Sequence, residues 1–336
     1  MSTATVTAPE NALPALDLKA LARRAALPAA VAAAALTVVI VGGGTLQAFA
    51  HALGRAAEAD PRWVAGAAAF ELLSFAGYVA LLWLVGGRAS ERLGLRASAE
   101  VTLGGAAATR LLPTGGAGGA AVTLWSFRRA GLTVGAATHT LLTFLVLLYS
   151  VFLASIAVAG GLLALGIVDG GGPVILSALP AAAATLAIGI ALGLAARRPT
   201  KQRTVAVGAA VRDALGLVRS ADPRLLGAVA WWAFDAAVLW AMLHALGAPP
   251  SLTVVVLAYF LGQVANTLPL PGAVSGGMVG VLLAFGVEPE VALPAVLAYR
   301  SIAIWLPAPI GLAALAGLRR TVAGWQPPPA IQSQGV

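Results

Sequence analysis

The sequence predicts an all-α polytopic membrane protein with about six full transmembrane helices and two re-entrant helical hairpins in an inverted-topology repeat. The first observation is composition: 60% of the 336 residues are hydrophobic, 10% are charged, and the mean hydropathy is +0.91. That is more apolar surface than a soluble core can bury. The second observation is a pair of apolar segments broken by proline and glycine. The third is a strong bias of basic residues toward one side of the predicted membrane.

The first broken segment covers residues 101–131, where two apolar runs of about 11 or 12 residues flank Pro113, Thr114, Gly115 and Gly116. A helix of that length reaches only about 18 Å, roughly half of the ~30 Å hydrocarbon layer. Proline removes a backbone donor and glycine frees the backbone, so the helix is predicted to stop and turn. Irregular backbone at membrane depth is tolerated only in protein or beside a wet cavity, so the break indicates a binding site.

A second broken segment, residues 259–286, repeats this pattern with Pro271, Gly272 and Ser275 at its break. Placing Pro113 on Pro271 also superposes Gly104 on Gly262. Each broken segment follows a span that carries an Ala-Phe-acid triplet, ending in Glu71 and in Asp235 respectively, and each precedes a long span. We therefore predict two repeats, residues 63–165 and 225–312, of opposite membrane direction.

The remaining elements follow in chain order. Residues 1–27 are predicted to be a disordered N-terminus with a short interfacial helix, and residues 28–317 a single transmembrane domain. Its full spans are 28–50, 63–85, 134–165, 174–195, 225–246 and 291–312. Residues 197–224 form a basic cytoplasmic loop whose stripe of Val207, Val211, Leu215 and Val218 predicts a helix on the membrane surface. Residues 318–336 are predicted to be a disordered tail.

Charge gives the orientation. With both termini in the cytoplasm, 17 of the 21 Lys and Arg residues lie inside, two lie outside and two lie within membrane segments. Such asymmetry is typical of a multi-pass protein of the bacterial cytoplasmic (inner) membrane. Because the basic residues lie at the ends of apolar segments, the net charge of +8 is not read as a nucleic-acid surface, and membrane lipids are the expected partners.

Three ionisable residues are predicted near one plane inside the bilayer: Glu71, Asp235 and Arg300. Charges there are costly, so each is a candidate for substrate binding. A guanidinium in this position can grip a phosphate with two parallel hydrogen bonds. The alternative is a buried structural ion pair between Arg300 and one of the acids. Polar residues just before the breaks, Arg110, Thr109, Gln263 and Asn266, are either ligands or caps for freed backbone.

Chemistry beyond binding has little support in the sequence. Ser275 is a weak candidate nucleophile because no histidine follows residue 244, so we predict that the protein is not an enzyme. Three histidines and no cysteine leave little for a metal centre, and no cofactor is predicted.

The two breaks with their sequels, RLLPTGGAGGAAVTLWSFRRAGLTVGAA and LPLPGAVSGG followed by AYRSIAIWLPAPIG, resemble the lysylphosphatidylglycerol synthase transmembrane-region family. This family is the flippase half of the bacterial multiple peptide resistance factor. The resemblance covers about residues 25–320 and implies an inner-membrane fold that moves lipids between leaflets. It also implicates Pro113, Gly115, Gly116, Pro271, Gly272, Tyr299, Arg300, Pro307 and Gly311 by position.

The sequence departs from the family pattern in its carboxylates. Ala273 and Ser275 follow the second break, and Met278 stands near the place of an expected glutamate, so Glu71 or Asp235 would have to substitute. No soluble aminoacyl-transfer domain is expected after the last span.

The leading hypothesis is a flippase-like transporter of an anionic or phosphate-bearing lipid head group, with Arg300 as the phosphate contact. The alternatives are a secondary transporter of a small organic anion and a non-transporting partner of a separate lipid-modifying enzyme. A homo-oligomer is left open.

Overall fold

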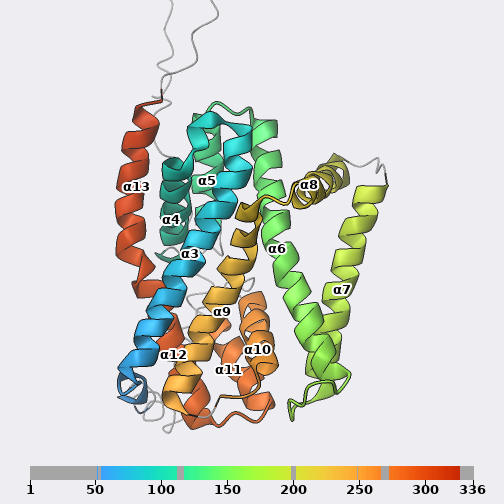
Figure 1. Ribbon diagram of the computed structural model, residues 1–336, viewed down its shortest axis with the longest axis vertical. Coiled ribbons are helices and arrows are strands. Elements are labelled where there is room, and N and C mark those ends of the chain that lie inside the picture. The colour runs from blue at the N-terminus through green and yellow to red at the C-terminus, as the bar shows by residue number, and fades with distance from the viewer. Residues whose placement is uncertain are drawn as a thin grey trace, which may run out of the picture.

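The computed structural model describes residue 51 and residues 54–111, 117–197, 202–247, 249–265 and 272–325. The predicted first span (28–50), the N-terminal segment before it and the last eleven residues of the tail lie outside these ranges. Within them, every regular element is a helix, as predicted. Figure 1 shows the helices gathered into one elongated bundle.

Five helical segments in the described ranges are long and apolar enough to cross a membrane. They are α3 (Pro61–Ala89), α6 (Val134–Ala164), α7 (Val174–Ala196), η2 with α9 (Pro223–Leu225 and Leu226–Leu246), and α12 with α13 (Pro289–Trp305 and Pro307–Ala323). Each overlaps a predicted span. The sequence predicts them well because an apolar run of about 20 residues is typical of a transmembrane helix.

The last of these spans is longer than predicted. The sequence suggested residues 291–312, but α13 continues to Ala323 and so includes residues 318–323, which were assigned to the tail. The helix is interrupted at Leu306, and Pro307 begins α13. Proline lacks an N–H and clashes with the preceding turn, so it divides the span into two differently directed helices (Figure 1).

Two pairs of shorter helices follow α3 and α9. The first pair is α4 (Leu95–Leu111) and α5 (Ala117–Arg129), joined to α3 by the short helix η1 (Glu91–Leu93). The second is α10 (Leu252–Val264) and α11 (Ala273–Ala284). In Figure 1 the first pair occupies the upper half of the bundle and the second pair the lower half. We call the end of the bundle with η1 and η2 the upper end and the opposite one the lower end.

Helix α8 (Gln202–Arg219) lies across the upper end and packs on α6 and α7 (Figure 1). The predicted helix is present, and it docks on the bundle mainly through residues outside the stripe that was predicted for the membrane surface. Val211 is buried, whereas Val207 and Val218 are exposed. Ala210, Ala214 and Leu217 are buried instead. Small residues face inward because α8 docks against two other helices, where close approach favours alanine and glycine.

Candidate functional site

The tight crossing of α3 and α9 forms the centre of the bundle. A Cβ added to Gly227 would lie 2.3 Å from the carbonyl oxygen of Gly77, so only glycine allows this approach. The Ser74 hydroxyl donates to the backbone oxygen of Trp231 at 2.8 Å. One turn further, the rings of Phe70 and Phe234 stack with centroids 6.0 Å apart. The two helices are thereby fixed against each other near the middle of the bundle.

Each stacked phenylalanine immediately precedes one of the predicted acids. Glu71 is fully buried on α3, and Asp235 on α9 is only 3% exposed. Because the stack pairs the preceding residues, the two acids lie at a similar height, as the sequence predicted. The structure gives them different surroundings, however: Asp235 contacts polar side chains of α10 and α12, while Glu71 lies beside an apolar groove.

Asp235 is the centre of a buried polar cluster, which we define as Asp235, Tyr259, Gln263 and Tyr299. The Tyr259 hydroxyl donates to Oδ2 of Asp235 at 2.5 Å. The Tyr299 hydroxyl lies 3.4 and 3.5 Å from the two carboxyl oxygens and accepts a hydrogen bond from the Gln263 amide at 3.2 Å. Both tyrosines are at most 1% exposed. Helices α9, α10 and α12 thus bring four polar side chains together at the depth of the α3–α9 crossing.

The polar cluster contains hydroxyl, amide and carboxyl groups but no cation. Among the described side chains, no lysine or arginine forms an ion pair with Asp235. A carboxyl group held by neutral donors retains acceptor sites for a further donor, such as a hydroxyl or amine of a polar head group. The geometry therefore suits recognition of a polar group that reaches the middle of the bundle.

Arg300 follows Tyr299 on α12 and is partly exposed. No hydrogen bond or ion pair joins its guanidinium to another described side chain. The alternative of a structural ion pair with Glu71 or Asp235 is therefore not formed in this structure. A guanidinium at this depth without a carboxylate partner is costly in a bilayer, so Arg300 keeps its place as a candidate ligand for an anion.

Thr109 has a structural role in the first short pair. Its hydroxyl accepts a hydrogen bond from the backbone N–H of Gly119 at 3.0 Å and donates to the carbonyl of Gly105 at 3.0 Å. The N–H of Gly119 belongs to the first turn of α5, which has no intrahelical acceptor. Of the two predicted roles for Thr109, ligand and cap, the structure shows the cap.

The other predicted break residues divide into two groups. Gly272 adopts φ +80°, which favours glycine, and directly precedes α11. Ser275 lies in the first turn of α11 and is partly buried. Outside the described residues lie Pro113, Thr114, Gly115, Gly116, Asn266 and Pro271, together with the side chain of Arg110.

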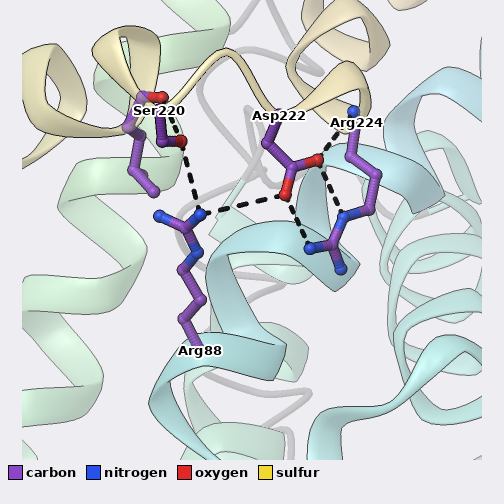
Figure 2. Close-up of polar contacts among 5 residues, drawn as sticks. Arg88, Ser220, Asp222 and Arg224 are labelled. Carbon is purple, nitrogen blue, oxygen red and sulfur yellow. Dashed lines mark hydrogen bonds and ion pairs between the residues drawn. The ribbon is translucent and has the colours of Figure 1, made fainter.

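Two polar features were not predicted from the sequence. One is Tyr259, which looked like part of an apolar run. The available signal was its spacing of four residues from Gln263, which places both on one face of a helix. The other is an ionic cluster at the upper end (Figure 2), made of Arg88, Asp222 and Arg224.

The ionic cluster is organised by Asp222. The carboxylate accepts hydrogen bonds from Nε of Arg224 at 3.0 Å and Nη2 of Arg224 at 2.7 Å, and lies 3.8 Å from Nη2 of Arg88 (Figure 2). Hydrogen bonds from the side chain and then the backbone of Arg224 lower the pKa of Asp222 to about 2. The Arg224 guanidinium also stacks over Trp83, 4.6 Å from its ring centroid.

An apolar groove of about 370 Å³ lies between α3, α4 and the α12–α13 junction. It is lined by Glu71, Leu72, Phe75, Ala76, Val79, Ala80, Trp83, Leu95, Leu103, Leu306, Pro307 and Ile310. A second cavity, of about 580 Å³, lies among the loops of the lower end beside Asp169 and Glu288. Within the described ranges, no three histidine or acidic side chains gather as a metal ion would require.

The comparisons with known proteins confirm the family resemblance that the sequence predicted. A family model described as the lysylphosphatidylglycerol synthase TM region matches residues 25–311. No curated protein matches the chain.

Proposed function

The chain belongs to the lysylphosphatidylglycerol synthase transmembrane-region family, and from this premise we propose that it moves an anionic or phosphate-bearing lipid head group between the two leaflets. The observation that carries the proposal is the buried polar cluster around Asp235, which lies in the middle of a lipid-embedded bundle. Polar and ionisable groups at that depth are costly, so by default they mark a functional site.

The short helix pairs support a path that is open to both leaflets. With 17 and 13 residues, α4 and α5 reach about 26 and 20 Å, and α10 and α11 are no longer than α5. None reaches the ~30 Å of a hydrocarbon layer. Since one pair occupies the upper and the other the lower half (Figure 1), we infer two re-entrant hairpins that meet near the midplane.

Contacts between matching positions support the inverted repeat. Phe70 and Phe234 are equivalent in the Ala-Phe-acid match and stack on each other, as residues near a two-fold axis do. In the first pair Gly119 approaches Gly105, and in the second Gly277 approaches Gly262. Placing Pro113 on Pro271 superposes Gly104 on Gly262, whereas in the structure Gly104 packs against Leu315 of α13. The equivalence is therefore offset by one residue at this position.

Charge distribution supports the orientation. Basic residues of α3, α5, α8 and α13 lie in the last turn of each helix, at the upper end: Arg88, Arg128, Arg129, Arg219 and Arg320. The loops of the lower end carry Asp169 and Glu288. We infer from the bias of cytoplasmic loops toward Lys and Arg that the upper end faces the cytoplasm of a bacterial cell.

A vesicle assay with head-group-labelled phospholipid tests the proposal. We expect the reconstituted wild type to move the label between leaflets and Arg300→Ala to slow it by about tenfold or more, the worth of a lost charge-assisted hydrogen bond. Arg319→Ala removes an exposed guanidinium of α13 and serves as the matched control. Equal rates for wild type and Arg300→Ala would remove Arg300 from the mechanism.

The same preparation separates the alternatives. Uptake of a small organic anion without any dependence on lipid would favour a secondary transporter. A stable co-purifying enzyme without translocation would favour a partner of a lipid-modifying enzyme. The proposal contains no covalent step, and labelling by a fluorophosphonate probe that disappears in Ser275→Ala would contradict it.

A further inference from the structure

The apolar groove has the lining of a site for hydrocarbon. Apart from Glu71 and the indole nitrogen of Trp83, its side chains are aliphatic or phenyl. Glu71 is fully buried at one end and presents no surface to water. In a protein surrounded by lipid, a groove of this chemistry selects an apolar and flexible occupant.

The length of the groove corresponds to one leaflet. From Glu71 to Trp83 the lining follows α3 over twelve residues, which corresponds to about 18 Å along the helix axis. Half of the ~30 Å hydrocarbon layer is about 15 Å. Since Glu71 lies near the middle of the bundle and Trp83 near the upper end, the groove extends from the midplane to the interface of one leaflet.

The groove is too small to enclose a whole helix. A helix about 10 Å wide and 18 Å long fills roughly 1,400 Å³. The groove offers about 370 Å³. A single extended hydrocarbon chain is the occupant that matches both its length and its volume.

The mouth of the groove at the upper end carries positive charge. Arg224 lies over Trp83, a groove residue, and shares Asp222 with Arg88 (Figure 2). Two guanidinium groups and one carboxylate leave a net charge of about +1. The side chains of Arg88 and Arg224 are 47% and 31% exposed, so both retain donors for a further anion. Tryptophan and arginine are typical of the head-group level of a membrane.

We propose that this groove holds one acyl chain of a phospholipid from the leaflet at the upper end, with the lipid phosphate against Arg88 and Arg224. The inference rests on the proposed function in that it assigns the place where the lipid is held before its head group crosses. It commits to a phospholipid because the groove joins a hydrocarbon-lined channel of leaflet depth to a cationic mouth. A hydrocarbon chain without a phosphate would fill the channel but would not pair with the arginines at its mouth.

Photocrosslinking of the full chain in vesicles tests the acyl-chain site. The probe is a phosphatidylglycerol with a diazirine on one acyl chain, and labelled peptides are identified by mass spectrometry. We expect labels on α3, α4 and α13 in the wild type and their loss in Ala76→Phe, which fills the groove with a ring. Ala183→Phe adds the same ring to the exposed face of α7 and is the matched control. Unchanged labelling in Ala76→Phe would overturn the site.

A second measurement tests the mouth. A diacylglycerol with the same diazirine lacks the phosphate, so we expect it to label the groove about tenfold less than phosphatidylglycerol, the worth of one charge-assisted contact. Arg88→Gln should narrow this difference without removing the acyl labels. Equal labelling by the two wild-type probes would overturn the phosphate contact.

Failure of the groove and failure of the proposed function have different signatures. Groove labelling without translocation would leave the lipid site standing and refute transport. Translocation without groove labelling would refute the lipid site and leave the transport proposal standing.

Discussion

At the scale of single residues, Thr109 connects the two helices of the first short pair through one hydroxyl. It accepts from the N–H of Gly119 and donates to the carbonyl of Gly105. Because water is scarce at membrane depth, a freed N–H at the start of α5 depends on such a side chain. The role assigned to Thr109 is thus stabilisation of the turn rather than contact with substrate.

We expect Thr109→Val to destabilise the protein by about 1 kcal/mol, because valine keeps the shape but leaves the Gly119 N–H without its acceptor. Thermal unfolding in detergent, followed by size-exclusion chromatography, measures the change. Thr123→Val is the matched control, since the Thr123 hydroxyl donates only to the carbonyl four residues earlier in its own helix. Equal destabilisation by both variants would contradict the capping role.

Asp222 makes the stability of the upper end depend on pH. Arg224 lowers the pKa of this carboxyl from 3.8 to about 2, so the folded state favours the ionised form of the Asp222 side chain. Its contribution to stability is fully present above pH 3.8 and is lost as pH falls toward about 2.

Comparison of wild type with Asp222→Asn across that pH range tests this assignment. We expect the wild type to be the more stable at pH 5 and the difference in melting temperature to disappear as the carboxyl protonates near pH 2. Other acids titrate equally in both proteins and cancel in the difference. A difference that stays constant down to the lowest pH would contradict the role of Asp222.

The polar residues show what the sequence could and could not predict at this scale. Composition alone marks Glu71, Asp235 and Arg300, because ionisable residues are rare in apolar spans. It does not identify their partners, which come from other helices. Tyr259 lies between Ala258 and Phe260, so the sequence suggests an ordinary core residue. Only the folded structure shows its hydrogen bond to Asp235. The pairing of Arg88 and Arg224 through Asp222 joins segments far apart in the chain in the same way.

At the scale of elements, the α3–α9 crossing depends on two glycines. We expect Gly227→Ala to cost about 1–3 kcal/mol, because the new Cβ would lie 2.3 Å from the Gly77 carbonyl oxygen and 3.0 Å from the Leu81 nitrogen, so the helices must separate. Gly189→Ala on α7 meets nothing within 4 Å and should be neutral or stabilising, since alanine favours a helix interior. Unfolding of both variants in lipid nanodiscs measures the difference. A Gly227→Ala protein as stable as wild type would contradict the close crossing.

Element boundaries and faces were predicted unevenly. The spans were located well because their length is set by the bilayer. The residues by which α8 docks on the bundle were not predicted, because the apolar stripe indicates only the face expected at the membrane surface. The actual contact uses Ala210 and Ala214, whose small size matters only once α6 and α7 are adjacent. The extension of α13 past residue 312 was hidden by its arginines, which suit an interfacial helix end.

At the scale of the whole molecule, the proposed orientation is open to a direct test because the chain contains no cysteine. Ser251→Cys lies at the lower end before α10, and Ala323→Cys at the upper end of α13, and both positions are exposed. In intact cells we expect a membrane-impermeant maleimide to label only Ser251→Cys, because cytoplasmic sites are protected by the bilayer.

The parent chain supplies the unlabelled control, and Ala323→Cys should react only after the cells are permeabilised. The reverse pattern would invert the orientation. Labelling of both positions in intact cells would contradict a bundle that spans the membrane between its two ends.

Helix α7 is held by glycines near its two ends. Gly160 of α6 allows close approach of Ser177 and Ala181, and Gly208 of α8 lies against the carbonyl of Leu194. Between these anchors, Leu186 and Ile190 are exposed to the surrounding lipid. Selection on the middle of α7 therefore needs to preserve only hydrophobicity, whereas the residues in close contact near its two ends, Gly160 with Ser177 and Ala181, and Gly208 with Leu194, must change together. Among relatives of this chain, we expect the sequence to vary more at the centre of α7 than at the contact positions near its two ends.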